Sequence, residues 1–266
     1  MDKKNVNLIY FVGDSNGNFG DELSKVVVNK YINKNTHNLF LNKFKKENIN
    51  FIAIGSMIQA AKNDYVVWGS GLITDKPSRG LNDYRRLNIH AIRGPLSRKF
   101  IENMKLNIDV PEIYGDPALL CSEFIQPDRL PNFADKIGIV PHYSNHIKIK
   151  KMFNESTLNK SDYIFIDPLG LHMEVLKKII SCKYIISNSL HGLIISDAYN
   201  VPNVWLNIQI AHHPDFKFLD YFESQSREVK FIKNFDEFEI TNYAYNGGNK
   251  VNLDLLKESF PFKWKC

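Results

Sequence analysis

The amino-acid sequence predicts an α/β fold built from two Rossmann-like domains. Three observations support this prediction. Short apolar runs alternate with amphipathic stretches along nearly the whole chain, which is typical of parallel strands covered by helices on both faces. A segment with two prolines, at residues 124–135, interrupts this alternation. The length of 266 residues suits two domains of roughly 120–140 residues each.

The first half of the chain contains short apolar strands separated by helices. The expected strands cover residues 7–12, 51–54, 65–68 and 89–92. After the first strand comes a glycine-rich loop and then a helix at residues 22–32, for which Asp21 is the expected N-cap. Pro95 follows Gly94 and is expected at the first position of another helix, where proline is accepted. We assign residues 1–125 to the first domain.

The second half repeats this alternation. Expected strands cover residues 137–140, 163–166, 184–186 and 201–206, and expected helices cover residues 171–181 and about 190–199. We therefore assign residues 136–266 to a second domain and residues 126–135 to a linker. Two such halves predict a GT-B-like architecture. Ligands are then expected in the cleft between the domains, at the carboxyl ends of the strands.

Composition narrows the classes of function. The net charge is +5, without a basic run or motif that would indicate a nucleic-acid partner. The N-terminus lacks the apolar core of a signal peptide, and no apolar stretch is long enough to span a membrane, so we expect a cytoplasmic protein. The cysteines, Cys121, Cys182 and Cys266, lack the spacing of a zinc site and are expected to be reduced thiols. Asp-x-Asp is absent, and we expect no metal and no cofactor.

The glycine-rich loop at residues 13–22 is the first candidate for a binding site. It presents Asp14, Asn16 and Asp21 between a strand and a helix. Carboxylates would repel a phosphate, so the loop is better suited to binding sugar hydroxyls. The alternative is a tight turn with a helix cap and no contact with ligand.

Two further strand ends carry charged residues. Arg93 lies between a strand and a helix N-terminus, where a guanidinium and the positive helix end would together bind a carboxylate or phosphate. The alternative for Arg93 is a salt bridge between the domains. Asp116, followed by Pro117, is expected to cap the next helix, with a role in the cleft as the alternative.

The most informative motif is Ser187-Asn188-Ser189-Leu190-His191-Gly192. It places a histidine in the first turn of a helix that follows a strand, next to backbone N–H groups that can hold an anion. His191 would transfer a proton near neutral pH; the alternative is a structural histidine. His142 follows another strand and is a weaker candidate for catalysis, whereas His212 and His213 are expected in an ordinary loop.

Together these segments resemble the polysaccharide pyruvyltransferase family. The resemblance covers residues 8–222, and its motifs are found at residues 16–23, 68–71 (which include Ser70), 93–97, 115–120, 166–168, 187–192, 197–202 and 217–221. Each motif alone is weak, but their order and the Ser-Leu-His-Gly element are specific. Some members carry an arginine before Leu-His-Gly, where this chain has Ser189, so we expect that an anion contact is missing or supplied from elsewhere.

The resemblance implies a GT-B-like fold and transfer of a pyruvyl group from phosphoenolpyruvate to a sugar of a surface polysaccharide, such as a capsule or exopolysaccharide, or its lipid-linked precursor. It implies that Arg93 binds donor anions and that His191 acts as acid or base. In a mechanism consistent with these residues, protonated His191 donates to the methylene carbon, with Asp14 or His142 as the base. The acceptor would lie on the side of the first domain and the donor on the side of the second. The expected substrate-binding residues are Arg93, Ser189, Leu190, Gly192, Asn188, Asn16, Asp21 and Ser70.

Two other functions remain open from the sequence. One is a metal-independent GT-B glycosyltransferase that uses a nucleotide sugar, because a fold does not fix a reaction. The other is a glycan-binding protein without catalytic activity. A lipid-linked acceptor would also bring the protein into peripheral contact with the inner face of the membrane.

Overall fold

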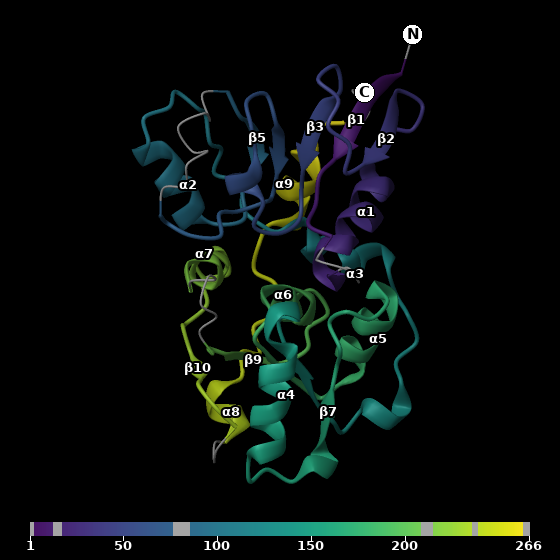
Figure 1. Cartoon of the computed structure of the whole chain (residues 1–266), viewed down its shortest axis with the longest axis vertical. Coiled ribbons are helices and arrows are strands. Elements are labelled where there is room, and N and C mark those ends of the chain that lie inside the picture. The colour runs from purple at the N-terminus through teal and green to yellow at the C-terminus, as the bar shows by residue number, and fades with distance from the viewer. Residues whose placement is uncertain (1–2, 13–17, 77–85, 209–214, 236–238, 263–266) are drawn as a thin grey trace.

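The computed structural model describes residues 3–12, 18–76, 86–208, 215–235 and 239–262. Within these ranges it contains two five-stranded sheets in which every pair of neighbouring strands is parallel, one above the other in Figure 1. The expected α/β class with two parallel-sheet halves is therefore confirmed.

The first sheet has the order β2-β1-β3-β4-β5. Its strands are β1 (Lys4–Leu8), β2 (His37–Leu41), β3 (Ile49–Ile52), β4 (Val66–Trp68) and β5 (Asn88–Ala91). The sequence analysis did not predict β2. This strand lies at the edge of the sheet and none of its residues is fully buried, so it lacks the continuous apolar run that marks the inner strands.

The second sheet has the order β10-β9-β8-β6-β7. Its strands are β6 (Ile137–Val140), β7 (Tyr163–Phe165), β8 (Tyr184–Ser187), β9 (Asn203–Leu206) and β10 (Phe231–Ile232). The helices of the described residues are α1 (Phe19–Tyr31), α2 (Pro95–Asn103), α3 (Cys121–Phe124), α4 (His146–Glu155), α5 (His172–Ser181), α6 (Leu190–Ala198), α7 (Phe216–Ser224), α8 (Ile240–Tyr243) and α9 (Leu253–Glu258).

The start of α1 differs from the prediction. The helix begins at Phe19, and its N-cap is Asn18, whose side chain accepts a hydrogen bond from the Gly20 backbone N–H. The prediction that Asp21 caps this helix was wrong, because asparagine caps as well as aspartate and stands three residues earlier. As a result Asp21 lies in the first turn of the helix. The expected Pro95 at the start of α2 is confirmed.

One apolar core joins the two halves. Buried side chains of α1, α5 and α6 belong to the same cluster, and α6 also packs against the short 3₁₀ helix η3 (Pro117–Leu120) of the first half. Every residue of α6 is buried. This helix is therefore held on all sides between the two sheets.

The end of the described chain returns to the first sheet (Figure 1, yellow). The Trp68 indole N–H donates to the Leu256 carbonyl at 2.8 Å. Phe260 packs with its ring centroid 4.8 Å from Trp68, and Phe262 lies 4.9 Å from Phe51. These residues, which the sequence analysis assigned to the second domain, thus cover a face of the first sheet.

The strand orders place one switch point in each sheet. In the first sheet, β1 has β2 on one side and β3 on the other, and in the second sheet β6 lies between β7 and β8. Loops that leave β1 and β3, or β6 and β8, run to opposite sides and leave a crevice at the carboxyl ends of the strands. Ligands bind in such crevices in open α/β sheets.

Candidate functional site

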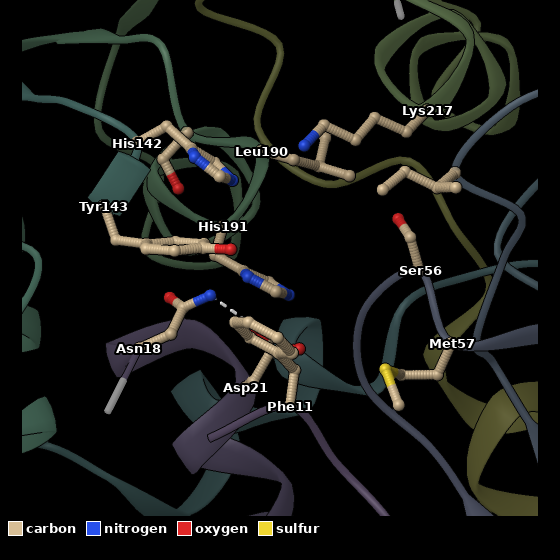
Figure 2. A pocket seen from close by; sticks show the side chains of 12 residues that line it. Phe11, Asn18, Asp21, Ser56, Met57, His142, Tyr143, Leu190, His191 and Lys217 are labelled. Carbon is tan, nitrogen blue, oxygen red and sulfur yellow. Dashed lines mark hydrogen bonds between the residues drawn. The ribbon is translucent and has the colours of Figure 1, made fainter. Parts of the chain in front are cut away.

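A pocket lies between the two switch points. Its lining residues are Phe11, Asn18, Asp21, Ser56, Met57, Ile73, His142, Tyr143, Ser189, Leu190, His191 and Lys217 (Figure 2). They come from the loops after β1, β3 and β4 and the start of α1 in the first half, and from the loop after β6, the segment from β8 into α6, and α7 in the second. The two halves of the chain therefore build this pocket together.

His191 lies in the first turn of α6, directly above the α1 backbone. A Cβ on Gly20 would lie 2.1 Å from the imidazole ring, so only glycine at that position leaves room for it. Its Nε2 is buried, has no hydrogen-bond partner among the described residues, and lies 4.0 Å from Asp116 Oδ2. Burial, followed by the charges of Lys217 and Arg93, lowers the pKa of His191 to about 3. The resting imidazole is therefore neutral, whereas the predicted acid role requires imidazolium.

Asp21 faces the pocket from the first turn of α1. Its Oδ2 accepts a hydrogen bond from the Asn18 side-chain amide at 2.5 Å (Figure 2), and its side chain is almost fully buried. Burial and the charge of Asp116 raise the pKa of Asp21 to about 8, although Lys217 opposes this shift. Near neutral pH this carboxyl group is mostly protonated.

Lys217 extends from α7 into the pocket, across from Asp21 and His191 (Figure 2). The residue is only 5% exposed. Burial and the charge of Arg93 lower its pKa to about 8, while Asp21 raises it. No carboxylate within the described ranges forms a salt bridge with it. A buried ammonium without a protein counter-ion attracts an anionic ligand.

Asp116 closes the back of this cluster. Its Oδ1 accepts a hydrogen bond from the Ala118 N–H at 2.9 Å and its Oδ2 one from the Gly55 N–H at 3.0 Å. The expected cap by Asp116, with Pro117 at the first position, is confirmed. Burial raises its pKa to about 6, and the two backbone donors oppose this shift. Asp116 thus fixes the Gly55 loop and also lies next to His191.

Arg93 forms the salt bridge that was its alternative role. Its side chain is fully buried, with Nε 2.9 Å and Nη2 2.8 Å from Asp220 Oδ2 on α7. Nη1 donates to Ser56 Oγ, and Nη2 also donates to the Leu72 carbonyl, both at 2.6 Å. Arg93 therefore connects the first sheet to α7 and reaches the pocket wall through Ser56. Its direct contact with a ligand anion stays a prediction.

The remaining residues of the Ser-Leu-His-Gly element have separate roles. Ser189 and Leu190 line the pocket at the N-terminus of α6. Asn188 lies behind them, where its amide donates to the carbonyls at positions 206 and 208. A Cβ on Gly192 would lie 2.2 Å from Ser187 Oγ, which explains the glycine by close packing.

The other predicted residues fall into three groups. Ser70 is fully buried and donates to the Gly55 carbonyl at 2.9 Å, so it supports the loop that carries Ser56. His142 lines the pocket, and its Nδ1 lies 2.8 Å from Ser144 Oγ. Asp14 and Asn16, together with His212 and His213, lie outside the described residues.

The sequence analysis gave no role to several residues of the site. Lys217, which lines the pocket, and Asp220, which lies behind it, belong to a motif of the family resemblance, and both are buried among the aromatic residues of α7. Charges at buried positions of an otherwise apolar helix are the signal that could have identified them. Phe11 and Tyr143, whose ring centroids lie 5.5 Å apart across the mouth of the pocket, gave no comparable signal.

Comparisons with known proteins point to one family. A model of the polysaccharide pyruvyl transferase family matches residues 17–209. The chain is 26% identical over 221 residues to the uncharacterized protein L143 of Acanthamoeba polyphaga mimivirus. This alignment covers 82% of this chain and 74% of that protein. It is 25% identical over 229 residues to the succinoglycan biosynthesis protein ExoV of Rhizobium meliloti. This alignment covers 81% of this chain and 64% of ExoV.

The described residues contain no group of three or more histidine, cysteine, aspartate or glutamate side chains arranged to hold a metal ion. Their helices are all too short or too polar to cross a membrane.

Proposed function

Because the chain belongs to the polysaccharide pyruvyl transferase family and is accordingly a transferase, we propose that its pocket moves a pyruvyl group from phosphoenolpyruvate to a sugar. The acceptor is a surface polysaccharide or its lipid-linked precursor, and the product is a ketal. The relation to ExoV, a succinoglycan biosynthesis protein, supports an exopolysaccharide as the acceptor. The paired parallel sheets with a pocket between them support a GT-B-like arrangement of donor and acceptor.

The buried Lys217 ammonium is the observation that carries this proposal. It faces the N-terminus of α6, whose first backbone N–H groups belong to residues 190–192. A lysine and a helix N-terminus together form a site for carboxylate or phosphate. Phosphoenolpyruvate carries both groups. Some family members have an arginine at the position of Ser189. In this chain Lys217, on the facing helix α7, supplies the cation near that position.

The acceptor enters from the mouth of the pocket. Phe11 of the first half and Tyr143 of the second flank this mouth, and Phe11 is 36% exposed. Aromatic side chains have a large apolar face that a sugar ring can cover. The acceptor therefore binds between the domains, with two hydroxyl groups directed toward the donor held by Lys217.

The reaction needs one proton transfer to carbon and two additions of a hydroxyl group. Protonation of the methylene carbon makes the central carbon electrophilic, and the first hydroxyl attacks it. Phosphate then leaves, and the second hydroxyl closes the ketal. His191 is positioned to transfer a proton in this sequence, and such a group contributes about 10²–10⁴-fold in rate.

A thermal unfolding experiment tests the proposal. Phosphoenolpyruvate at 100 times its Kd adds about 2.7 kcal/mol of stability, which corresponds to roughly 5–10 °C in a chain of this size. Lys217→Met should lose this shift, whereas Lys230→Met, which replaces a surface lysine, should keep it. If UDP-glucose stabilises the protein and phosphoenolpyruvate does not, the chain is a glycosyltransferase instead.

A further inference from the structure

Asp21, Asp116 and His191 form a buried cluster on one side of the pocket. A Cβ on Gly55 would lie 2.5 Å from Asp21 Oδ1 and 3.6 Å from His191 Cε1, so both side chains converge on the same stretch of backbone. His191 Nε2 lies 4.0 Å from Asp116 Oδ2. The imidazole of His191 therefore lies close to both carboxyl groups.

The two carboxyl groups differ in their hydrogen bonds. Both oxygens of Asp116 accept hydrogen bonds from backbone N–H groups, and such donors favour the ionised form of a carboxyl group. Asp21 has a hydrogen bond from Asn18 to Oδ2 only, and within the described ranges Oδ1 accepts none. Two neighbouring buried carboxyl groups do not both ionise readily. Asp116 is therefore the anion of the pair, and Asp21, which lines the pocket, carries its proton on Oδ1.

We propose that Asp21 is the general acid that protonates the methylene carbon of phosphoenolpyruvate, and that His191 is the base for the first acceptor hydroxyl. This inference rests on the proposed function. It replaces the expectation that His191 donates the proton, and it gives Asp21 a catalytic role in place of simple contact with a sugar. The environments that raise the pKa of Asp21 to about 8 and lower that of His191 to about 3 support the division of roles.

The steps balance without any further reactant. The Asp21 carboxyl proton bonds to the methylene carbon, which becomes a methyl group, and the π electrons of the double bond form this C–H bond. The first hydroxyl oxygen bonds to the central carbon and its proton passes to His191. The bond from the central carbon to the phosphate oxygen then breaks, and phosphate leaves with the electron pair. The second hydroxyl oxygen attacks the same carbon, and its proton goes to the phosphate. Transfer of the His191 proton to Asp21 restores the resting site.

The charge of the substrate favours these roles. An anion held by Lys217 raises the pKa of nearby acids and bases. Asp21 therefore stays protonated until its proton moves to carbon. The pKa of His191 rises from about 3, which makes the imidazole a stronger base once phosphoenolpyruvate is bound.

Asp21→Asn tests the acid role, because asparagine has nearly the same shape but no proton to give. We expect turnover, measured as phosphate release with an acceptor, to fall by about 10²-fold or more. The thermal shift with phosphoenolpyruvate should remain, because the carboxyl proton is not needed for binding at Lys217. Glu22→Gln is the matched control on the same helix: Glu22 pairs with Lys25 and does not line the pocket, so this variant should keep its turnover.

A rescue experiment separates an acid from a structural carboxylate. Asp21→Ala leaves a space in the pocket that acetic acid can enter. If Asp21 is the acid, added acetate buffer restores turnover in proportion to the concentration of the protonated form as pH is varied. Rescue that follows the acetate anion, or near-normal turnover of Asp21→Asn, overturns this inference. If phosphoenolpyruvate fails to stabilise even the wild-type protein, the proposed function itself fails.

Discussion

The salt bridge between Arg93 and Asp220 offers a test of how the site is held. Arg93→Met removes the guanidinium but keeps much of the side-chain volume. Within the described part of the chain, Asp220 would then keep two hydrogen bonds, from the Ser97 N–H and hydroxyl, both 2.7 Å long. A buried carboxylate that loses its cationic partner is strongly destabilised.

The magnitude follows from complete burial of both partners. Arg93 and Asp220 have no exposed side-chain surface, and breaking such a pair costs about 3–5 kcal/mol. In a chain of this size each kcal/mol of lost stability lowers Tm by about 2–4 °C, so Tm should fall by roughly 6–20 °C. The surface pair of Arg86 and Asp64, whose side chains are 69% and 67% exposed, provides the control: Arg86→Met should cost less than about 1 kcal/mol.

Urea unfolding of four proteins measures this effect. The set is the wild type, Arg93→Met, Asp220→Leu and the double variant. Because the double variant leaves no unpaired buried charge, it should be less destabilised than the sum of the two single changes, and the coupling energy should exceed about 1 kcal/mol. If Arg93→Met instead unfolds with the wild-type free energy and only loses phosphoenolpyruvate binding, then Arg93 is a direct ligand of the donor and the salt bridge contributes nothing.

Three further predictions concern the cluster around His191. Gly20→Ala should reduce turnover by at least about 10-fold, because a Cβ there would lie 2.1 Å from the imidazole; wild-type turnover would show that the ring is free to move. His191→Ala and His191→Asn should both keep a folded protein, judged by Tm, and both lose about 10²-fold or more in phosphate release. A structural histidine would instead lower Tm, with activity falling only in step with the folded fraction. The pKa of Asp21, raised to about 8 from 3.8, means that the folded state binds more protons than the unfolded state between these values, so stability is lost as pH rises through this window. The free energy of unfolding of Asp21→Asn, taken relative to that of wild type, should therefore rise by roughly 1 kcal/mol per pH unit between pH 5 and pH 8. If urea unfolding gives both proteins the same dependence of this free energy on pH, the pKa shift of Asp21 is contradicted.

Strand positions were predictable where burial is continuous. Residues 137–140 form β6 as expected, because an inner parallel strand is covered on both faces and reads as an apolar run. The edge strand β2 is half exposed and gave no such run. The return of Phe260 and Phe262 to the first sheet was also missed, because contacts between positions nearly 200 residues apart leave no local pattern; the Trp68–Leu256 hydrogen bond spans 188 residues.

The candidate site was predictable to the extent that strand ends define it. His142, Ser189 and His191 follow strands of one sheet, and the structure brings all three into one pocket. Ionisation could not be predicted in the same way. The shifts of Asp21 and His191 arise from burial between two domains and from neighbours far away in the sequence. Lys217 belongs to the site because the Arg93–Asp220 salt bridge holds α7 against the first sheet, and this contact spans 127 residues of sequence.

The return of α9 to the first sheet means that the chain passes between the domains twice. One passage follows α3 and the other precedes α9, and the described C-terminal residues cover Trp68 and Phe51. A fragment that ends at residue 125 would lack this aromatic cover and expose part of its own core, so the first domain is not expected to be a separable unit.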